Sequence, residues 1–264
     1  MPDLEGDLTL LERRVRDAGK IAMQYFCGSY RRWNKEGGSP VTEADLAIDN
    51  FLKTELHRGR PDYGWLSEES VDDPARLKKN RIFVVDPIDG TVAFMKGRPQ
   101  FTICAAIVES GRPVAGVVLN PAQDECFTAV TGGGAQLNGQ SIRVGSVDTI
   151  PGLRLLADKK FFSEWPPMQI ESFSSIAYRI ALVAMAKFDA MISLTIKRDW
   201  DLAAADVILA EAGGTLAGAD GAQLGYNGPL AIQGPTIAAG PGLIGPLLAE
   251  LAAKNSLKAR SDSL

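Results

Sequence analysis

The segment from Arg81 to Thr91 constrains the fold of this chain more than any other stretch. It begins with an apolar run that is typical of a buried strand, and it ends abruptly in Asp-Pro-Ile-Asp-Gly-Thr. Strands of this kind have their ligands at the carboxyl end, where loops are free to carry chemistry. The turn brings Asp86 and Asp89 into one compact cluster of hard oxygen atoms. Such a cluster suits Mg²⁺ better than any soft metal.

Charge and apolar patterning exclude several kinds of partner. The 264-residue chain has a net charge of −4, which leaves no basic footprint for nucleic acid, so a stable nucleic-acid complex is disfavoured. No stretch approaches the roughly 18 apolar residues of a membrane-spanning helix. The acidic N-terminus also lacks the apolar core of a signal peptide. We therefore expect a cytoplasmic protein with no membrane partner.

Histidine and cysteine are too sparse for two common kinds of active site. The single histidine, His57, lies near the end of a predicted helix, so neither a Ser-His-Asp triad nor a multi-histidine zinc site is expected. The cysteines Cys27, Cys104 and Cys126 are odd in number and far apart, which indicates buried free thiols in a reducing compartment. Any metal chemistry must therefore rely on carboxylates.

Hydrophobic periodicity predicts an α+β half over residues 1–144. Apolar residues at three- and four-residue steps indicate a long amphipathic helix over residues 4–26. Thr42 and Asp45 form a capping pattern for a second helix that ends near Arg58. Two helices flanking a meander of antiparallel strands make an α+β unit. The strands are predicted at residues 101–108, 113–119 and 125–130.

The pattern changes near residue 145, and residues 145–264 predict an α/β half. Strands are predicted at residues 153–157, 189–193, near 216 and at 237–239. Helices are predicted at residues 174–187, 201–212 and 241 to about 254. The polar tail, residues 255–264, is expected to fray. We expect the two halves to pack tightly as one catalytic unit.

Further carboxylates occur in two other segments. Glu68 and Glu69 follow a short apolar stretch, and Asp201 opens a predicted helix. Each has a structural explanation when taken alone, because Asp201 could serve as an N-cap and Asp86 and Asp89 as turn residues. Together they supply what a phosphoryl-transfer site with two or three Mg²⁺ ions needs, in which the metals clamp the attacking water and the leaving oxygen.

The residues after Asp89 extend the same pattern. The Thr91 hydroxyl would position the attacking water or help to deprotonate it. The amides of Gly90 and Thr91 would hold phosphate oxygens, particularly if a helix begins there. These groups and the carboxylates together indicate phosphoryl transfer.

Several motif segments occur in a fixed order along the chain. They include Val-Thr-Glu-Ala-Asp (41–45), Leu-Ser-Glu-Glu-Ser (66–70), Val-Asp-Pro-Ile-Asp-Gly-Thr (85–91) and Trp-Asp-Leu-Ala-Ala-Ala-Asp (200–206). In this order they resemble the inositol monophosphatase superfamily over nearly the whole chain. This resemblance implies a layered αβαβα architecture, α+β and α/β in character, that is usually dimeric. It also implies a Mg²⁺-dependent, lithium-sensitive phosphomonoesterase that acts on a small phosphorylated metabolite.

The resemblance also implies the metal ligands. Glu68, Asp86 and the Ile88 carbonyl would hold the first Mg²⁺. Asp86, Asp89 and Asp201 would hold the second, and Glu68 would reach a third, weaker one. Lithium sensitivity would follow from a small cation replacing one Mg²⁺.

Other roles carry over by the same motifs. Thr91 and Asp45 would form the dyad that activates the nucleophilic water, so Asp45 is expected to be catalytic as well as a helix cap. Glu69 and Lys35 would support the site from its edge.

Departures from the family pattern concern the substrate. Many inositol phosphatases carry a glutamate seven residues before the Trp-Asp aspartate, and this chain has Leu194 there. Segments 66–69 and 97–102 look closer to the bacterial 3′(2′),5′-bisphosphate nucleotidase branch. A second phosphate would explain the cations Arg179, Lys197 and Arg198, although the same three residues could lie on a solvated face.

Three functions are therefore consistent with the sequence. The first is a bisphosphate nucleotidase that removes the 3′-phosphate from adenosine 3′,5′-bisphosphate, with Arg179 and Lys197 as substrate contacts. The second is an inositol-1-phosphatase or a broad sugar phosphatase with the same chemistry. The third is a regulatory protein that reuses the fold without depending on catalysis, because fold alone does not fix function.

Overall fold

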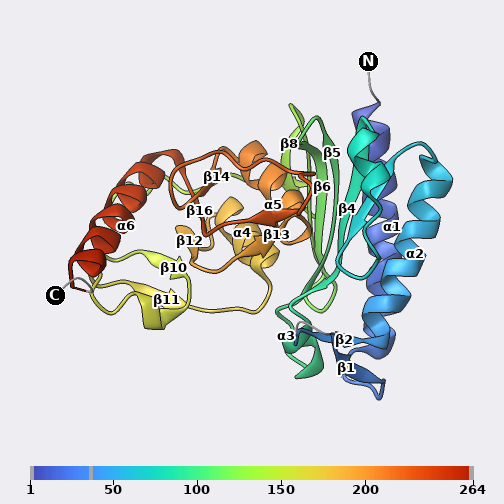
Figure 1. Ribbon diagram of the computed structural model, residues 1–264, viewed down its shortest axis with the longest axis horizontal. Coiled ribbons are helices and arrows are strands. Elements are labelled where there is room, and N and C mark those ends of the chain that lie inside the picture. The colour runs from blue at the N-terminus through green and yellow to red at the C-terminus, as the bar shows by residue number, and fades with distance from the viewer. Residues whose placement is uncertain (1–2, 36–37, 262–264) are drawn as a thin grey trace.

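The structure, a computed structural model, describes residues 3–35 and 38–261, with side chains described as far as Lys254. Its elements form five layers (Figure 1). Two outer helices cover a seven-stranded sheet, two further helices lie between this sheet and a five-stranded sheet, and a last helix covers the far side. The helices are α1 (Leu4–Tyr25) and α2 (Glu43–Gly59), then α4 (Ile176–Ala184) and α5 (Asp199–Glu211), and finally α6 (Pro241–Ser261). This αβαβα layering is the predicted fold class.

The seven-stranded sheet has the order β3-β4-β5-β6-β7-β8-β9. Only the β3–β4 pair is parallel, and the remaining neighbours are antiparallel, as a meander predicts. Its strands are β3 (Gly64–Ser67), β4 (Arg81–Asp89), β5 (Thr102–Glu109), β6 (Arg112–Asn120), β7 (Glu125–Val130), β8 (Gly134–Leu137) and β9 (Gln140–Ser141).

Strand β4 is buried on both faces, which explains its continuous apolar sequence. Ile82 and Val84 pack into the core beneath α4 and α5. Phe83 and Val85 alternate with them and pack against α1 and α2. The strand therefore lies between the two cores, and its last residue reaches the start of α4.

The five-stranded sheet has the order β11-β10-β12-β16-β14. It mixes parallel and antiparallel pairs, and α6 covers its outer face (Figure 1). Its strands are β10 (Arg154–Leu156), β11 (Gln169–Glu171), β12 (Ala190–Ser193), β14 (Thr215–Gly218) and β16 (Thr236–Ala239). Smaller elements are β1 (Arg32–Asn34) with β2 (Pro40–Thr42), β13 (Lys197–Arg198) with β15 (Ile232–Gln233), the short helix α3 (Thr91–Met95), and the 3₁₀ turns η1 (Pro74–Lys78) and η2 (Lys159–Phe161).

Several predicted boundaries are wrong, each for a local reason. Helix α4 starts later than predicted because the Ser175 side chain caps it, and it ends at Ala184, just before a positive-φ residue at 186. Helix α5 starts at Asp199 because Arg198 takes the extended N-cap position. Helix α6 continues to Ser261, so the tail predicted to fray is helical that far, and residues 262–264 lie outside the described part.

Cys27 also corrects an expectation, because it is exposed, whereas Cys104 and Cys126 are buried free thiols as predicted. Within the described residues, no helix combines the length and the apolar character needed to cross a membrane. The division into halves at residues 144 and 145 remains a prediction.

Helix α5 packs closely against strand β6 of the seven-stranded sheet. A Cβ atom added at Gly116 of β6 would lie 2.7 Å from the Ala204 carbonyl and 2.6 Å from a Val207 methyl group. No side chain other than hydrogen fits there without a shift of backbone. The run of alanines at residues 203–205 presents an equally small surface on the helix. This contact fixes the start of α5 relative to β4.

A buried carboxylate ties the outer helices to the first sheet. Asp7 of α1 is fully buried and accepts hydrogen bonds from Arg60 Nε at 2.7 Å, Arg81 Nη1 at 2.6 Å and the Tyr63 hydroxyl at 3.0 Å. Arg81 opens β4 and also donates to Glu109 at 3.0 Å. The network therefore joins α1, the end of α2 and the strand that carries the acidic turn.

We expect Asp7→Ala to lower the free energy of unfolding by about 3 kcal/mol, because removing one partner of a buried pair leaves Arg81 a poorly compensated charge. The measurement is urea unfolding at pH 7. Asp17→Ala is the matched control, since Asp17 lies on the same helix and pairs with Lys20 at the surface. Equal losses in the two variants would contradict a special role for the buried network.

Candidate active site

Two carboxylates of β4 meet a third, from a distant part of the chain, at the end of the strand. Asp86 and Asp89 are the last acidic residues of this strand, separated by an irregularity in its pairing with β5. Asp201 comes from the first turn of α5. Their ligand oxygens all lie within 4.8 Å of one another. The structure thus brings together carboxylates that are more than a hundred residues apart in sequence.

Burial and mutual repulsion make this cluster electrostatically unfavourable without a cation. Burial and then the charges of Glu68 and Asp89 raise the pKa of Asp86 well above its ordinary value. Burial and then the charge of Asp89 raise the pKa of Asp201 to about 7. Oxygen ligands of this kind, held close together with like charges, fit a hard divalent cation such as Mg²⁺.

Hydrogen bonds from α4 hold Asp89 in place. Its Oδ2 accepts from the Ser175 hydroxyl and from the Ala177 amide, both at 2.7 Å. These bonds oppose burial, which nevertheless raises the pKa of Asp89 to about 6. The Ser175 contact was not predicted from the sequence. Its signal is a serine at the N-cap of α4, and only the fold shows that the same hydroxyl reaches Asp89.

Asp45 caps helix α2 and also contacts Thr91. Its Oδ2 accepts from the Thr42 amide at 2.8 Å and completes a capping box at the start of α2. Its Oδ1 accepts from the Thr91 hydroxyl at 3.5 Å, and the same hydroxyl lies 3.1 Å from the Ile88 carbonyl oxygen. Burial raises the pKa of Asp45 to about 6. One carboxylate can therefore cap a helix and face Thr91 because its two oxygens point to different partners.

Lys35 pairs with both glutamates of the neighbouring turn. Its Nζ donates to Glu68 Oε1 at 3.0 Å and to Glu69 Oε1 at 2.7 Å. Burial raises the pKa of Glu69 to about 7. Glu68 lies outside the tight carboxylate group, but its charge raises the pKa of Asp86, so the two carboxylates are electrostatically coupled. Lys35 thus neutralises part of the negative charge at this edge.

Gly90 provides the sharp turn between β4 and α3. Its φ of +96° lies in the left-handed region that favours glycine. A Cβ atom there would lie 3.1 Å from both the Gln100 carbonyl oxygen and the Ser175 nitrogen. Helix α3 begins at Thr91 and is five residues long, so a helix does start where the phosphate-binding hypothesis favoured one.

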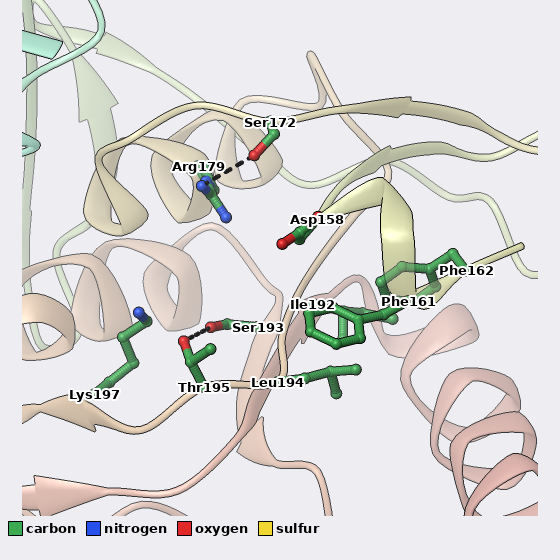
Figure 2. Close-up of a pocket in the computed structure, with 10 residues that line it drawn as sticks. All are labelled: Asp158, Phe161, Phe162, Ser172, Arg179, Ile192, Ser193, Leu194, Thr195 and Lys197. Atoms are coloured by element: carbon green, nitrogen blue, oxygen red, sulfur yellow. Dashed lines mark hydrogen bonds between the residues drawn. The ribbon is translucent and has the colours of Figure 1, made fainter. Parts of the chain in front are cut away.

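A pocket of about 170 Å³ contains two of the predicted substrate contacts. Figure 2 shows Arg179 and Lys197 on one side of it and Phe161, Phe162 and Leu194 on the other. The charges of Lys197 and Arg179 lower the pKa of Asp89 against the larger effect of burial, so this cationic side is coupled to the carboxylate cluster.

The predicted cation Arg198 faces another part of the surface. Its guanidinium donates to the Leu230 carbonyl at 3.0 Å and lies over the Trp200 ring, 5.9 Å from the centroid. For Arg198, the solvated-face interpretation is therefore the better one.

Comparison with known proteins identifies the class. A profile described as the inositol monophosphatase family matches residues 3–258. The chain is 34% identical over 203 residues to an inositol-1-monophosphatase of Mesorhizobium japonicum, covering 72% of this chain and 76% of the relative. It is 30% identical over 261 residues to the Nus factor SuhB of Pasteurella multocida, covering 91% and 94%. The solved IMPase of Thermotoga maritima superposes with a TM-score of 0.81 at 26% identity, covering 94% of this chain and 99% of that one.

The layered fold, the acidic cluster and these matches define a metal-dependent phosphomonoesterase. The chain belongs to the inositol monophosphatase family.

The raised pKa of Asp201 gives a testable pH dependence. Between about pH 4 and pH 7 the folded metal-free protein binds more protons at this residue than the unfolded chain, so stability falls as pH rises through that window. Asp201→Asn cannot ionise and should melt higher than the wild type at pH 8 in EDTA, with a smaller difference at pH 5. Melting curves at both pH values test this, with Asp17→Asn as a surface control. Equal pH dependence in Asp201→Asn and the wild type would contradict the electrostatic account.

Proposed function

We propose that this protein hydrolyses a small phosphomonoester with Mg²⁺ held by Asp86, Asp89 and Asp201, together with Glu68 and the Ile88 carbonyl. The observation that carries the proposal is the group of three carboxylates within 4.8 Å of one another, two of them buried. Bound Mg²⁺ would activate water and neutralise the charge that develops on phosphate. A small cation such as Li⁺ replacing one Mg²⁺ would inhibit the reaction.

In this proposal, Thr91 and Asp45 would activate the attacking water. The Thr91 hydroxyl donates to the Asp45 carboxylate, so it can in turn accept a hydrogen bond from water. A carboxylate with a pKa of about 6 is close to the optimum of a general base at neutral pH. The Gly90 and Thr91 amides, at the start of α3, would hold phosphate oxygens. Lys35 and Glu69 would keep Glu68 in place at the edge.

We expect Asp86→Asn to lower phosphate release by more than about a hundredfold, because it removes a proposed ligand, and even outer-shell partners of metals often contribute that much. Circular dichroism should show an unchanged fold. Mg²⁺ should raise the melting temperature of the wild type and have less effect on the variant. Asp62→Asn, at an exposed position, is the control. Full activity in Asp86→Asn, or a wild-type melting temperature indifferent to millimolar Mg²⁺, would refute the metal site.

The adjoining pocket favours a substrate with a second anionic group. Lys197 and Arg179 place two cations beside the carboxylate cluster, and Leu194 removes the acidic contact expected for an inositol ring. A pocket of about 170 Å³ suits a small metabolite. Adenosine 3′,5′-bisphosphate carries such a second phosphate and is our first choice of substrate. Inositol 1-phosphate and sugar phosphates are the alternative, and the name of the Mesorhizobium relative is consistent with it.

Phosphate release from adenosine 3′,5′-bisphosphate and from inositol 1-phosphate, measured side by side, decides the substrate. We expect the higher kcat/KM for the bisphosphate. Lys197→Met should lower that value by roughly tenfold, the equivalent of about 1.4 kcal/mol, and leave inositol 1-phosphate less affected. Arg198→Met is the matched control, because its guanidinium faces Leu230. A clear wild-type preference for inositol 1-phosphate would reverse our order of substrates.

A regulatory role is the second candidate function. The relative from Pasteurella multocida, similar over 91% of this chain, bears the name Nus factor SuhB. The phenotype of cells that carry the Asp89→Asn variant separates the two functions. A regulatory role would survive the loss of catalysis, so the phenotype would stay that of the wild type. We also propose that the protein is cytoplasmic, in keeping with the buried free thiols of Cys104 and Cys126. The proposal of a homodimer follows from the resemblance to a superfamily that is usually dimeric.

A further inference from the structure

We propose that Asp49 is a positioning residue that holds the turn bearing Glu68 and Glu69 ready for Mg²⁺, an inference that rests on the metal site proposed above. Asp49 lies on α2 and is only 4% exposed. Its Oδ1 accepts a hydrogen bond from the Ser67 hydroxyl at 2.5 Å, and its Oδ2 accepts one from the Ser70 hydroxyl at 2.6 Å. These two serines flank the two glutamates, so a single carboxylate holds both ends of the turn.

Each serine is also linked to the surrounding structure. Ser67 ends β3 beside Val85 of β4, and its hydroxyl oxygen lies 3.4 Å from the Glu69 amide, which donates to it. The Ser70 hydroxyl accepts a hydrogen bond from the Trp65 indole at 3.1 Å. The hydroxyls therefore use their donor capacity on Asp49 and their acceptor capacity on the turn and on β3.

The turn requires such an anchor because its charges oppose the arrangement. Glu68 and Asp86 are both proposed ligands of the same metal, and two carboxylates that face one site repel each other when no cation is bound. Lys35 restrains both glutamates from a partly exposed position. Asp49 restrains the same turn from the buried side. Without it, Glu68 could move away from Asp86, and binding of the metal would have to restore the arrangement.

Helix α2 links this anchor to the proposed water-activating pair. Asp45 and Asp49 are four residues apart, so they lie one above the other on the same face of the helix. Asp45 faces Thr91, and Asp49 faces the Glu68 turn. One rigid helix therefore sets the position of both groups relative to the end of β4.

Calorimetric titration of the metal-free, full-length protein with Mg²⁺ tests the inference directly. We expect Asp49→Ala to weaken Mg²⁺ affinity about tenfold or more, as is typical for residues that orient metal ligands. The Ser67→Ala/Ser70→Ala double variant keeps every charge and should show a comparable loss. Adding Asp49→Ala to this double variant should cause little further loss, because the same hydrogen bonds are already absent.

Activity provides the second measurement. The Mg²⁺ concentration for half-maximal phosphate release should rise in these variants, whereas kcat at saturating Mg²⁺ should stay near the wild-type value. Asp49→Asn keeps an acceptor for Ser67 and should recover part of the affinity. Glu55→Gln is the matched control, because it removes a carboxylate from the same helix that pairs instead with Arg14 and Arg58.

Wild-type Mg²⁺ affinity in the serine double variant would overturn the inference, even if Asp49→Ala bound weakly, because the effect would then come from the lost charge alone. If Asp49→Ala does not fold, the serine double variant decides the question by itself. A wild-type protein that binds no Mg²⁺ would refute the proposed metal site and this inference with it, so the two failures are distinguishable.

Discussion

Repulsion among Asp86, Asp89 and Asp201 is the constraint on which the arrangement of the site depends. Bringing these carboxylates within 4.8 Å of one another, with two of them almost fully buried, is unfavourable in the absence of a cation. Burial raises the pKa of all three, and the charges of neighbouring carboxylates raise the pKa of Asp86 and Asp201 further. A protein keeps such a cluster only where the rest of the fold holds it together, and a divalent cation is the species that would relieve the repulsion.

The fold supplies the restraint through elements that are each anchored elsewhere. Strand β4 is fixed because it is buried on both faces, and Arg81 at its start is held by Asp7. Helix α5 is fixed by its close contact with Gly116, which sets the position of Asp201. Ser175 at the start of α4 holds Asp89. The carboxylates therefore meet because three independently packed elements end at one place.

Much of the fold and of the site could be predicted from the sequence, and the features that could not be predicted have physical explanations. The alternation of apolar residues fixed the main helices and strands, and the motifs named every acidic residue of the cluster. The start of α5 was misplaced because Arg198 has no side-chain signal of a cap. Burial of Cys27 was wrongly expected because a residue near a helix end can face either way. The contacts of Ser175 with Asp89 and of Asp49 with Ser67 could not be predicted, because these partners are distant in sequence.

Sequence by itself determined the chemistry of this protein. The acidic turn after an apolar strand, the single histidine and the ordered motifs are local properties, and they indicate carboxylate-held metal and phosphoryl transfer whatever the packing. Only the tertiary structure decided which side chains act together. In the folded protein, Asp45 contacts both Thr42 and Thr91. The Arg198 guanidinium faces Leu230 and not the pocket, and Asp49 accepts a hydrogen bond from Ser67, next to Glu68. Such contacts depend on the packing of whole helices and strands, which no short segment of sequence encodes.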